Sequence, residues 1–250
     1  MSHVPRSPKG LERRRAWSYW LVAIATKAVA RAYLRIRVEG LERLPPGPSI
    51  IAFNHLSWAD PFILVAALPA RPRLLTFGPK EDDITSGTRN RLMVWSGRTV
   101  PFRPRKDDLL DTTRRVGRAL EAGHRLAIAP EGRIHVGESV LLPFDDGVAF
   151  FAMRSRVPIV PVAVNGTGWL RFGRRIRIRV GEPIRTNGRP TKAALAATTA
   201  AVHDVLAALI GDFPDEPPPG RFGRWFTELF NDWPEGSRPP LPESGTGRSE

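Results

Sequence analysis

Seven consecutive residues, Pro158 to Val164 (PIVPVAV), carry no polar side chain. A strand that faces water on one side alternates apolar and polar residues, whereas a continuous apolar run is typical of a strand covered on both faces. Layers of helices on both faces of a sheet are characteristic of α/β proteins. This run therefore predicts a largely parallel sheet with helices on each side.

Further candidate strands alternate with candidate helices along the chain. Strands are expected where short apolar or alternating runs end at Gly or Pro, namely 35–39, 49–53, 73–77, 98–102, 125–129, 158–164 and 176–180. Helices are expected at about 11–34, 60–68, 88–95, 107–122, 147–156 and 191–210. The expected fold class is α/β, a single domain with a mixed, mostly parallel sheet covered by helices, with an N-terminal amphipathic helix and a short C-terminal aromatic helix.

The chain divides into three expected parts. Residues 1–34 are a loose tail and a helix with three aromatic residues near a basic cluster, which suits either a membrane interface or packing on the domain. Residues 35–211 form the domain. Residues 212–250 contain a Pro-rich linker, an aromatic helix and a tail of disordered composition.

The chain carries a large positive charge. Its 38 Lys and Arg exceed its 25 Asp and Glu, giving a formal net charge of +13 over 250 residues. This excess favours an anionic partner, whether nucleic acid, a phosphate-bearing substrate or an anionic membrane. The chain has no cysteine, which excludes disulfides and thiolate metal sites.

The most informative polar residues stand between two apolar runs. Asn54 and His55 follow the expected strand 49–53, and Asp60 follows His55 after four residues, where a helix is expected to begin. Strand ends in α/β folds commonly carry chemistry. An imidazole held by a carboxylate accepts a proton from a hydroxyl near neutral pH. Asp60 followed by Pro61 also predicts a helix N-cap.

Three later segments add to this pair. They are Gly97-Arg98-Thr99-Val100-Pro101-Phe102-Arg103, then Pro130-Glu131-Gly132-Arg133 with Leu142-Pro143-Phe144 and Asp146-Gly147 behind it, and Val157-Pro158-Ile159-Val160-Pro161-Val162-Ala163. In this order, the four segments resemble those of the lysophospholipid acyltransferase family, whose best-known members are the 1-acylglycerol-3-phosphate acyltransferases. The resemblance covers about residues 35 to 185.

The sequence departs from the family pattern at three places. The spacing from Phe102 to Arg103 is one residue shorter than usual, no Thr stands between Gly132 and Arg133, and Asp145 occupies the place of an expected Lys. These departures bear on how the acceptor's phosphate is bound, and leave another lipid acceptor open.

The resemblance implies transfer of a fatty acyl group from acyl-CoA or acyl-ACP to the hydroxyl of a lysophospholipid, with 1-acylglycerol-3-phosphate as the leading acceptor. It implies His55 as general base and Asp60 as the group that orients it, with no metal and no cofactor. Substrate binding falls to Asn54, Arg103, Glu131, Gly132 and Arg133. Guanidinium groups match phosphate oxygens, and glycine lets a backbone approach a ligand closely.

Other functional classes find less support. The sequence has no G-x-S-x-G elbow, no phosphate-binding loop and no H-E-x-x-H motif. A non-catalytic protein that binds anionic lipid or nucleic acid remains an alternative on charge, although no nucleic-acid motif is present and no nucleic acid is expected as a partner. His124, His135 and His203 are interpreted as structural or solvent-facing.

The C-terminal aromatic residues recur at helical spacing, at Phe222, Trp225, Phe226, Leu229, Phe230 and Trp233. Arg221 and Arg224 are expected away from that stripe. The stripe either enters a bilayer interface or packs on the protein itself. The enzyme is expected at the cytoplasmic face of the cell membrane as a peripheral protein.

Overall fold

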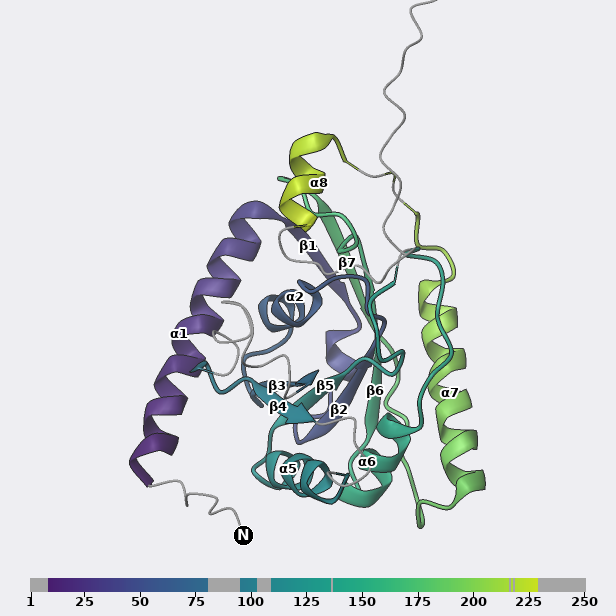
Figure 1. Ribbon diagram of the computed structural model, residues 1–250. Coiled ribbons are helices and arrows are strands. Elements are labelled where there is room, and N and C mark those ends of the chain that lie inside the picture. The colour runs from purple at the N-terminus through teal and green to yellow at the C-terminus, as the bar shows by residue number, and fades with distance from the viewer. Residues whose placement is uncertain are drawn as a thin grey trace, which may run out of the picture.

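In the part of the chain that the structure describes, seven strands form one sheet in the order β1-β7-β6-β2-β5-β3-β4 (Figure 1). The structure, a computed structural model, describes residues 9–80, 95–102, 109–135, 137–215, 217 and 219–228. The strands are β1 (Arg35–Glu39), β2 (Ser49–Phe53), β3 (Leu74–Lys80), β4 (Thr99–Phe102), β5 (Arg125–Ile128), β6 (Ile159–Asn165) and β7 (Arg175–Val180). All neighbouring pairs are parallel except β6 and β7, which are antiparallel.

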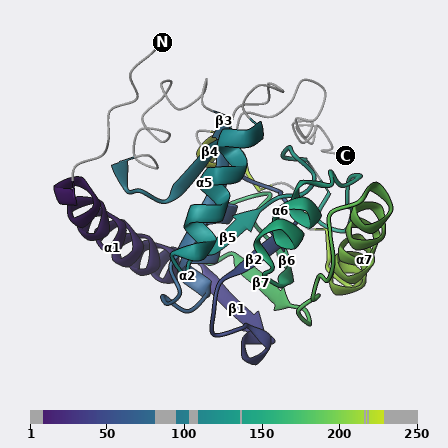
Figure 2. The same ribbon diagram turned by 90° about the horizontal axis from the view of Figure 1, so that it is seen from below.

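Helices cover both faces of this sheet. They are α1 (Lys9–Tyr33), α2 (Asp60–Ala67), α5 (Leu109–Glu121), α6 (Gly147–Ser155), α7 (Lys192–Ile210) and α8 (Arg221–Glu228), with a short 3-10 turn at Leu41–Arg43. Helix α1 lies on one side of the molecule and α7 on the other, with the sheet between them (Figures 1 and 2). The α/β class with a mixed, mostly parallel sheet is therefore confirmed.

Strand β2 contributes to both layers of the core. Ile50 and Ala52 belong to the cluster that includes residues of α5, α6 and α7, whereas Ile51 and Phe53 belong to the cluster that includes residues of α1 and α2. Successive side chains of a strand point to opposite faces, so a fully apolar strand fills both clusters. All seven residues of β6 are likewise buried, as the apolar run 158–164 predicts.

Helix α1 is anchored to the start of β3 by a buried tyrosine. The Tyr19 hydroxyl accepts a hydrogen bond from Leu74 N at 2.9 Å, and its ring lies 4.4 Å from the Arg98 guanidinium. Burial raises the pKa of the Tyr19 hydroxyl and lowers the pKa of the Arg98 guanidinium. The outward side of α1 carries exposed apolar residues, at Trp17, Leu21, Ile24 and Val29.

Helix α7 is the one helix in the described part of the chain that is long and apolar enough to cross a membrane. Its Val202, Leu206 and Ile210 are buried in the core, and the helix lies over β6. Directly after it, Phe213 joins the same core cluster and Asp215 accepts a hydrogen bond from Glu138 N. The boundaries at 34 and 211 remain predictions, since α1 and residues 213–215 both pack on the domain.

Most elements lie within three residues of the expected ranges, because local apolar periodicity specifies them. The expected helix 88–95 falls outside the described residues except for Trp95.

Candidate active site

The loop between β2 and α2 brings His55 and Asp60 together at the carboxyl edge of the central strands. His55 Nδ1 lies 2.8 Å from Asp60 Oδ2, and Asp60 is fully buried while His55 is partly exposed. An ionised carboxylate only accepts hydrogen bonds, so Nδ1 is the donor in this pair, and in the neutral imidazole Nε2 is then the acceptor. This tautomer is the one a general base requires.

Asp60 is not the N-cap that the sequence predicts. The N-cap of α2 is Ala59, and the Asp60 side chain makes no capping bond to its own helix. Its Oδ2 instead accepts hydrogen bonds from Leu56 N at 2.8 Å and Ser57 N at 2.9 Å. The carboxylate therefore shapes the loop that carries His55 as well as holding the imidazole.

Glu131 and His135 fasten the main chain of His55 from the other side. Glu131 Oε2 accepts a hydrogen bond from His55 N at 2.7 Å, and His135 N donates to His55 O at 3.2 Å. Glu131 Oε1 lies 2.9 Å from His135 Nε2 and accepts a second bond from Leu142 N. Both side chains are buried.

His135 is the site residue that sequence reasoning missed. Of the two sequence interpretations, the structural one is confirmed, since His135 is buried and bonded to Glu131, four residues earlier, and the solvent-facing one is wrong. The contact with His55 joins residues 80 apart in the sequence, and local patterns carry no information about such contacts.

The side chain of Asn54 also forms its hydrogen bonds with the main chain of the protein itself. Its Nδ2 donates to Val164 O at 2.8 Å and its Oδ1 accepts from Val164 N at 2.7 Å, and the residue is fully buried. The side chain thus extends the hydrogen bonding between β2 and β6 by one step. It fixes the point at which the chain turns away toward His55.

A cavity of about 370 Å³ opens beside His55. Its walls come from the ends of β2, β3, β4 and β5 and from α6, and they are mostly apolar, including Phe53, Phe77, Phe102, Ile128, Val148 and Phe151. His55, Gly132, Arg133 and Asp145 bring polar groups to it. The cavity therefore combines a basic nitrogen with space for an apolar chain.

Gly132 stands where the chain turns at the cavity wall. Its φ of +67° is one that L side chains rarely adopt, and a Cβ there would lie 3.3 Å from Asp145 Oδ2. Arg133 follows it, exposed and without an ion pair in the described residues. Arg103 lies outside the described residues, directly after Phe102 of the cavity wall. In the part of the chain that the structure describes, no group of three or more His, Asp or Glu is placed to hold a metal ion.

Comparison with known proteins agrees with this geometry. Residues 35–165 match the protein family described as Acyltransferase. The chain is 30% identical over 162 residues to a 1-acyl-sn-glycerol-3-phosphate acyltransferase of Saccharomyces cerevisiae, covering 61% of this chain and 52% of that protein. It is 28% identical over 161 residues to a protein of the same description from Cocos nucifera, covering 61% and 50%. The chain spans about half the length of the curated relatives it matches.

A solved structure shares the fold. The crystal structure of the 1-acyl-sn-glycerophosphate acyltransferase PlsC from Thermotoga maritima superposes with a TM-score of 0.62 at 17% sequence identity. The match covers 82% of this chain and 84% of that one, so the likeness extends over most of the sheet and its helices.

Proposed function

Because the chain belongs to the acyltransferase family, we propose that it transfers a fatty acyl group from acyl-CoA or acyl-ACP to the hydroxyl of a lysophospholipid. The leading acceptor is 1-acylglycerol-3-phosphate, since the two curated relatives are named for that reaction. The observation that carries the proposal is the contact of 2.8 Å between His55 Nδ1 and the buried Asp60 carboxylate, with His55 lining an apolar cavity.

The reaction needs no protein nucleophile. His55 Nε2 takes the proton from the acceptor hydroxyl as that oxygen bonds to the thioester carbonyl carbon. The carbon–sulfur bond then breaks, and the imidazolium returns the proton to the thiolate, which leaves as a free thiol. Asp60 favours the imidazolium as it forms, as the carboxylate of a catalytic triad does.

The cavity offers separate surfaces for the fatty acyl chain and for the phosphate of the acceptor. Its apolar walls suit a fatty acyl chain, because moving such a chain out of water is favourable by about 25 cal/mol per Å² of apolar surface. Arg133 at the cavity wall suits the phosphate of an acceptor. Arg103, which follows the cavity residue Phe102 in the sequence, is proposed to bind the same phosphate. Asn54 and Glu131 act indirectly by positioning His55, since their polar atoms already bond to the chain.

Asp145 favours a second acceptor. Its carboxylate lines the cavity with Arg133, at the place where the family pattern has Lys. An acid there repels a phosphate dianion and suits a headgroup that carries hydroxyl or amine donors. The second candidate is therefore acylation of another lipid, such as a glycolipid or a lysolipid with a less anionic headgroup.

We place the enzyme at the cytoplasmic face of the cell membrane as a peripheral protein. Its acceptor is insoluble and its thioester donors are cytosolic. The exposed apolar residues of α1, with Trp17 packed edge-on to Trp95 at 6.4 Å, suit contact with a bilayer interface.

The test is incubation of the purified full chain with labelled acyl-CoA or acyl-ACP and a panel of lysolipids, followed by lipid mass spectrometry. Acylated lysophosphatidate as the main product supports the first proposal, and an acylated neutral or glycosylated lipid supports the second. The same products from a folded His55→Ala protein would contradict the mechanism. A chain that acylates nothing yet binds anionic vesicles or nucleic acid would belong to the non-catalytic alternative.

A further inference from the structure

Helix α8 buries two of its polar residues and exposes two of its aromatic ones. Arg224 is only 3% exposed, with its guanidinium 5.5 Å from the Trp169 ring, and the Thr227 hydroxyl is fully buried. Phe222 and Trp225 are 70% and 55% exposed and contact each other at 5.6 Å. A helix packed on a water-soluble domain normally shows the opposite arrangement. Leu229, Phe230 and Trp233 of the predicted stripe lie outside the described residues.

The loop between β6 and β7 adds a third exposed ring. Phe172 is 75% exposed and packs edge-on against Tyr33 at the end of α1, at 5.8 Å. The loop is tied to α8 by Leu170 N, which donates to Thr227 Oγ1 at 2.9 Å. It is tied to α1 by Gly173 N, which donates to Tyr33 O at 2.8 Å.

Phe172, Phe222 and Trp225 thus stand on two segments that are bonded to each other, the loop between β6 and β7 and helix α8. We call these three residues the aromatic cap. Large apolar side chains that remain exposed together are characteristic of interaction surfaces.

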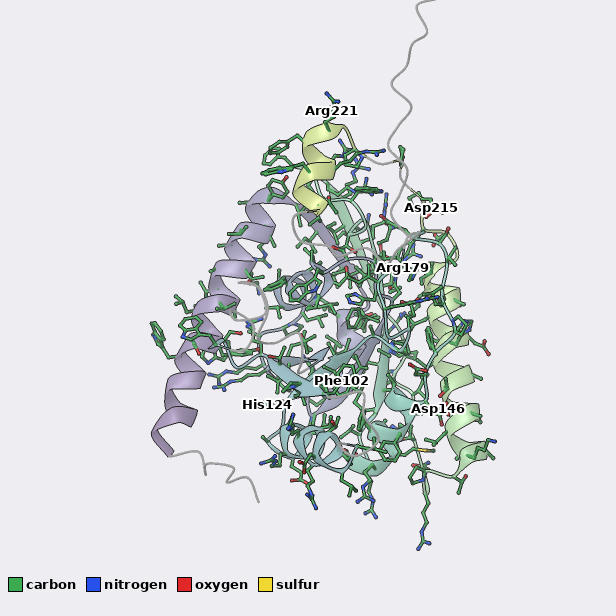
Figure 3. All side chains as sticks on the ribbon, viewed as in Figure 1. Phe102, His124, Asp146, Arg179, Asp215 and Arg221 are labelled. Atoms are coloured by element: carbon green, nitrogen blue, oxygen red, sulfur yellow. The ribbon has the colours of Figure 1, made fainter. Side chains whose placement is uncertain are left out.

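The segments that carry the aromatic cap are strongly basic. Residues 31–39, 169–178 and 221–228 contain nine arginines and only two acidic residues, Glu39 and Glu228. Five of these arginines, Arg31, Arg35, Arg171, Arg175 and Arg221, are exposed and form no ion pair within the described residues, whereas the exposed Arg37 pairs with Glu39. Figure 3 shows Arg221 pointing outward from the end of α8. Such a surface attracts anions, and guanidinium groups bind phosphate in particular.

The aromatic cap lies at the same edge of the sheet as the candidate active site. Strand β6 ends at Asn165, which pairs with Arg177 near the start of the antiparallel β7. Asn54, next to His55, bonds to Val164 at the end of β6. The loop with Phe172 therefore leaves the sheet at the same end of the strands as the loop after β2 that carries His55.

We propose that the aromatic cap docks on the surface of an anionic phospholipid bilayer, with the rings in the headgroup region and the arginines on lipid phosphates. The inference rests on the proposed function, because it supplies the route by which an insoluble acceptor reaches His55. Aromatic rings favour the interface between water and hydrocarbon, and one type of contact alone gives weak, reversible binding. Rings and arginines together supply the two signals that stable attachment requires.

The test compares variants of the full chain for binding to vesicles of phosphatidylcholine with and without phosphatidylglycerol. Phe172→Ser/Phe222→Ser/Trp225→Ser is expected to weaken binding at least about tenfold. Arg171→Ser/Arg221→Ser is expected to weaken binding only to the anionic vesicles, with a difference that high salt removes. The matched controls are Leu110→Ser, 71% exposed on α5, and Arg154→Ser, exposed on α6. Both controls should bind as the wild type does.

The readouts separate this surface from the proposed reaction. The triple variant should keep its thermal midpoint and its activity on a lysolipid below its micelle concentration, and lose activity on the same lipid in vesicles. Wild-type vesicle affinity in the triple variant overturns the docking and leaves the acyltransferase proposal standing. If the wild type has no transferase activity but binds vesicles, and the triple variant does not bind them, the proposed reaction is contradicted and the docking is supported. If the wild type is a dimer, the triple variant is a monomer and vesicle binding is unchanged, the docking proposal is overturned, and the aromatic cap is instead a contact between copies of the chain.

Discussion

At the scale of single residues, His55 is held at its ring and at both ends of its peptide unit. Asp60 holds Nδ1, Glu131 holds the main-chain N–H, and His135 holds the main-chain carbonyl. A base fixed in this way loses little free energy to reorganisation when the acceptor arrives. The predictions at this scale separate the chemistry from its support.

His55→Ala should lower turnover by about 10²–10⁴ while the fold is kept, because a lipid hydroxyl is a poor nucleophile without a base. Asp60→Asn should cost a similar order, since the amide no longer enforces the Nδ1–H tautomer. Steady-state kinetics with acyl-CoA, checked by thermal unfolding, measure both. His203→Ala on α7 is the matched control and should behave as the wild type.

Glu131→Gln should lower kcat by about 10²-fold with little change in acceptor KM, because a donor would face either the His55 N–H or His135. If Glu131 instead bound the substrate, as the sequence analysis predicts, the same variant would raise the acceptor KM and leave kcat unchanged. Kinetics at varied acceptor concentration decide between the two roles. Glu121→Gln, exposed at the end of α5, is the control.

Arg133→Ala should raise the acceptor KM by about tenfold and leave the KM for the thioester donor nearly unchanged. Arg133→Lys should rescue only in part, because the planar fork is lost. Arg103→Ala is expected to act in the same direction. If both Ala variants keep the wild-type acceptor KM, neither arginine binds the acceptor's phosphate.

At the scale of elements, α1 is tied to β3 by one hydroxyl. Leu74 N finds its acceptor in Tyr19, so Tyr19→Phe leaves a buried amide without a partner and should cost about 1–3 kcal/mol of stability. Tyr19→Ala also removes the contact with Arg98 and should cost more. Urea titration measures both free energies of unfolding. Equal stability of Tyr19→Phe and the wild type would mean that α1 docks through its apolar residues alone.

At the scale of the whole molecule, part of the acid sensitivity should come from His124. Burial, with a smaller contribution from Arg73, lowers the pKa of His124 below 6.5. The unfolded chain therefore binds the proton more readily, so this contribution to stability is present above pH 6.5 and is lost as pH falls below it. His124→Asn should lose less stability than the wild type between pH 7.5 and 5.5 in urea titrations. An equal loss in both proteins would contradict this assignment.

The element ranges and the pairing of His55 with Asp60 follow from the sequence because both are local. A run such as 158–164 reports burial on two faces, and a spacing of five residues across one turn keeps two side chains in reach. The prediction of Asp60 as an N-cap was wrong because the loop amides of Leu56 and Ser57 compete for the same oxygen. Nothing in residues 59–63 records that competition.

By itself, the sequence determined the α/β class, the strands and helices, and the residues from which a base and its carboxylate are drawn, since apolar periodicity and short-range spacing are properties of neighbouring residues. Tertiary structure alone decided that β7 runs against β6, that Glu131 and His135 fasten the main chain of His55, and that α8 turns Arg224 inward and Trp225 outward. Each depends on contacts between residues at least 12 apart in the sequence, and the free energy of such contacts is determined only when the segments meet.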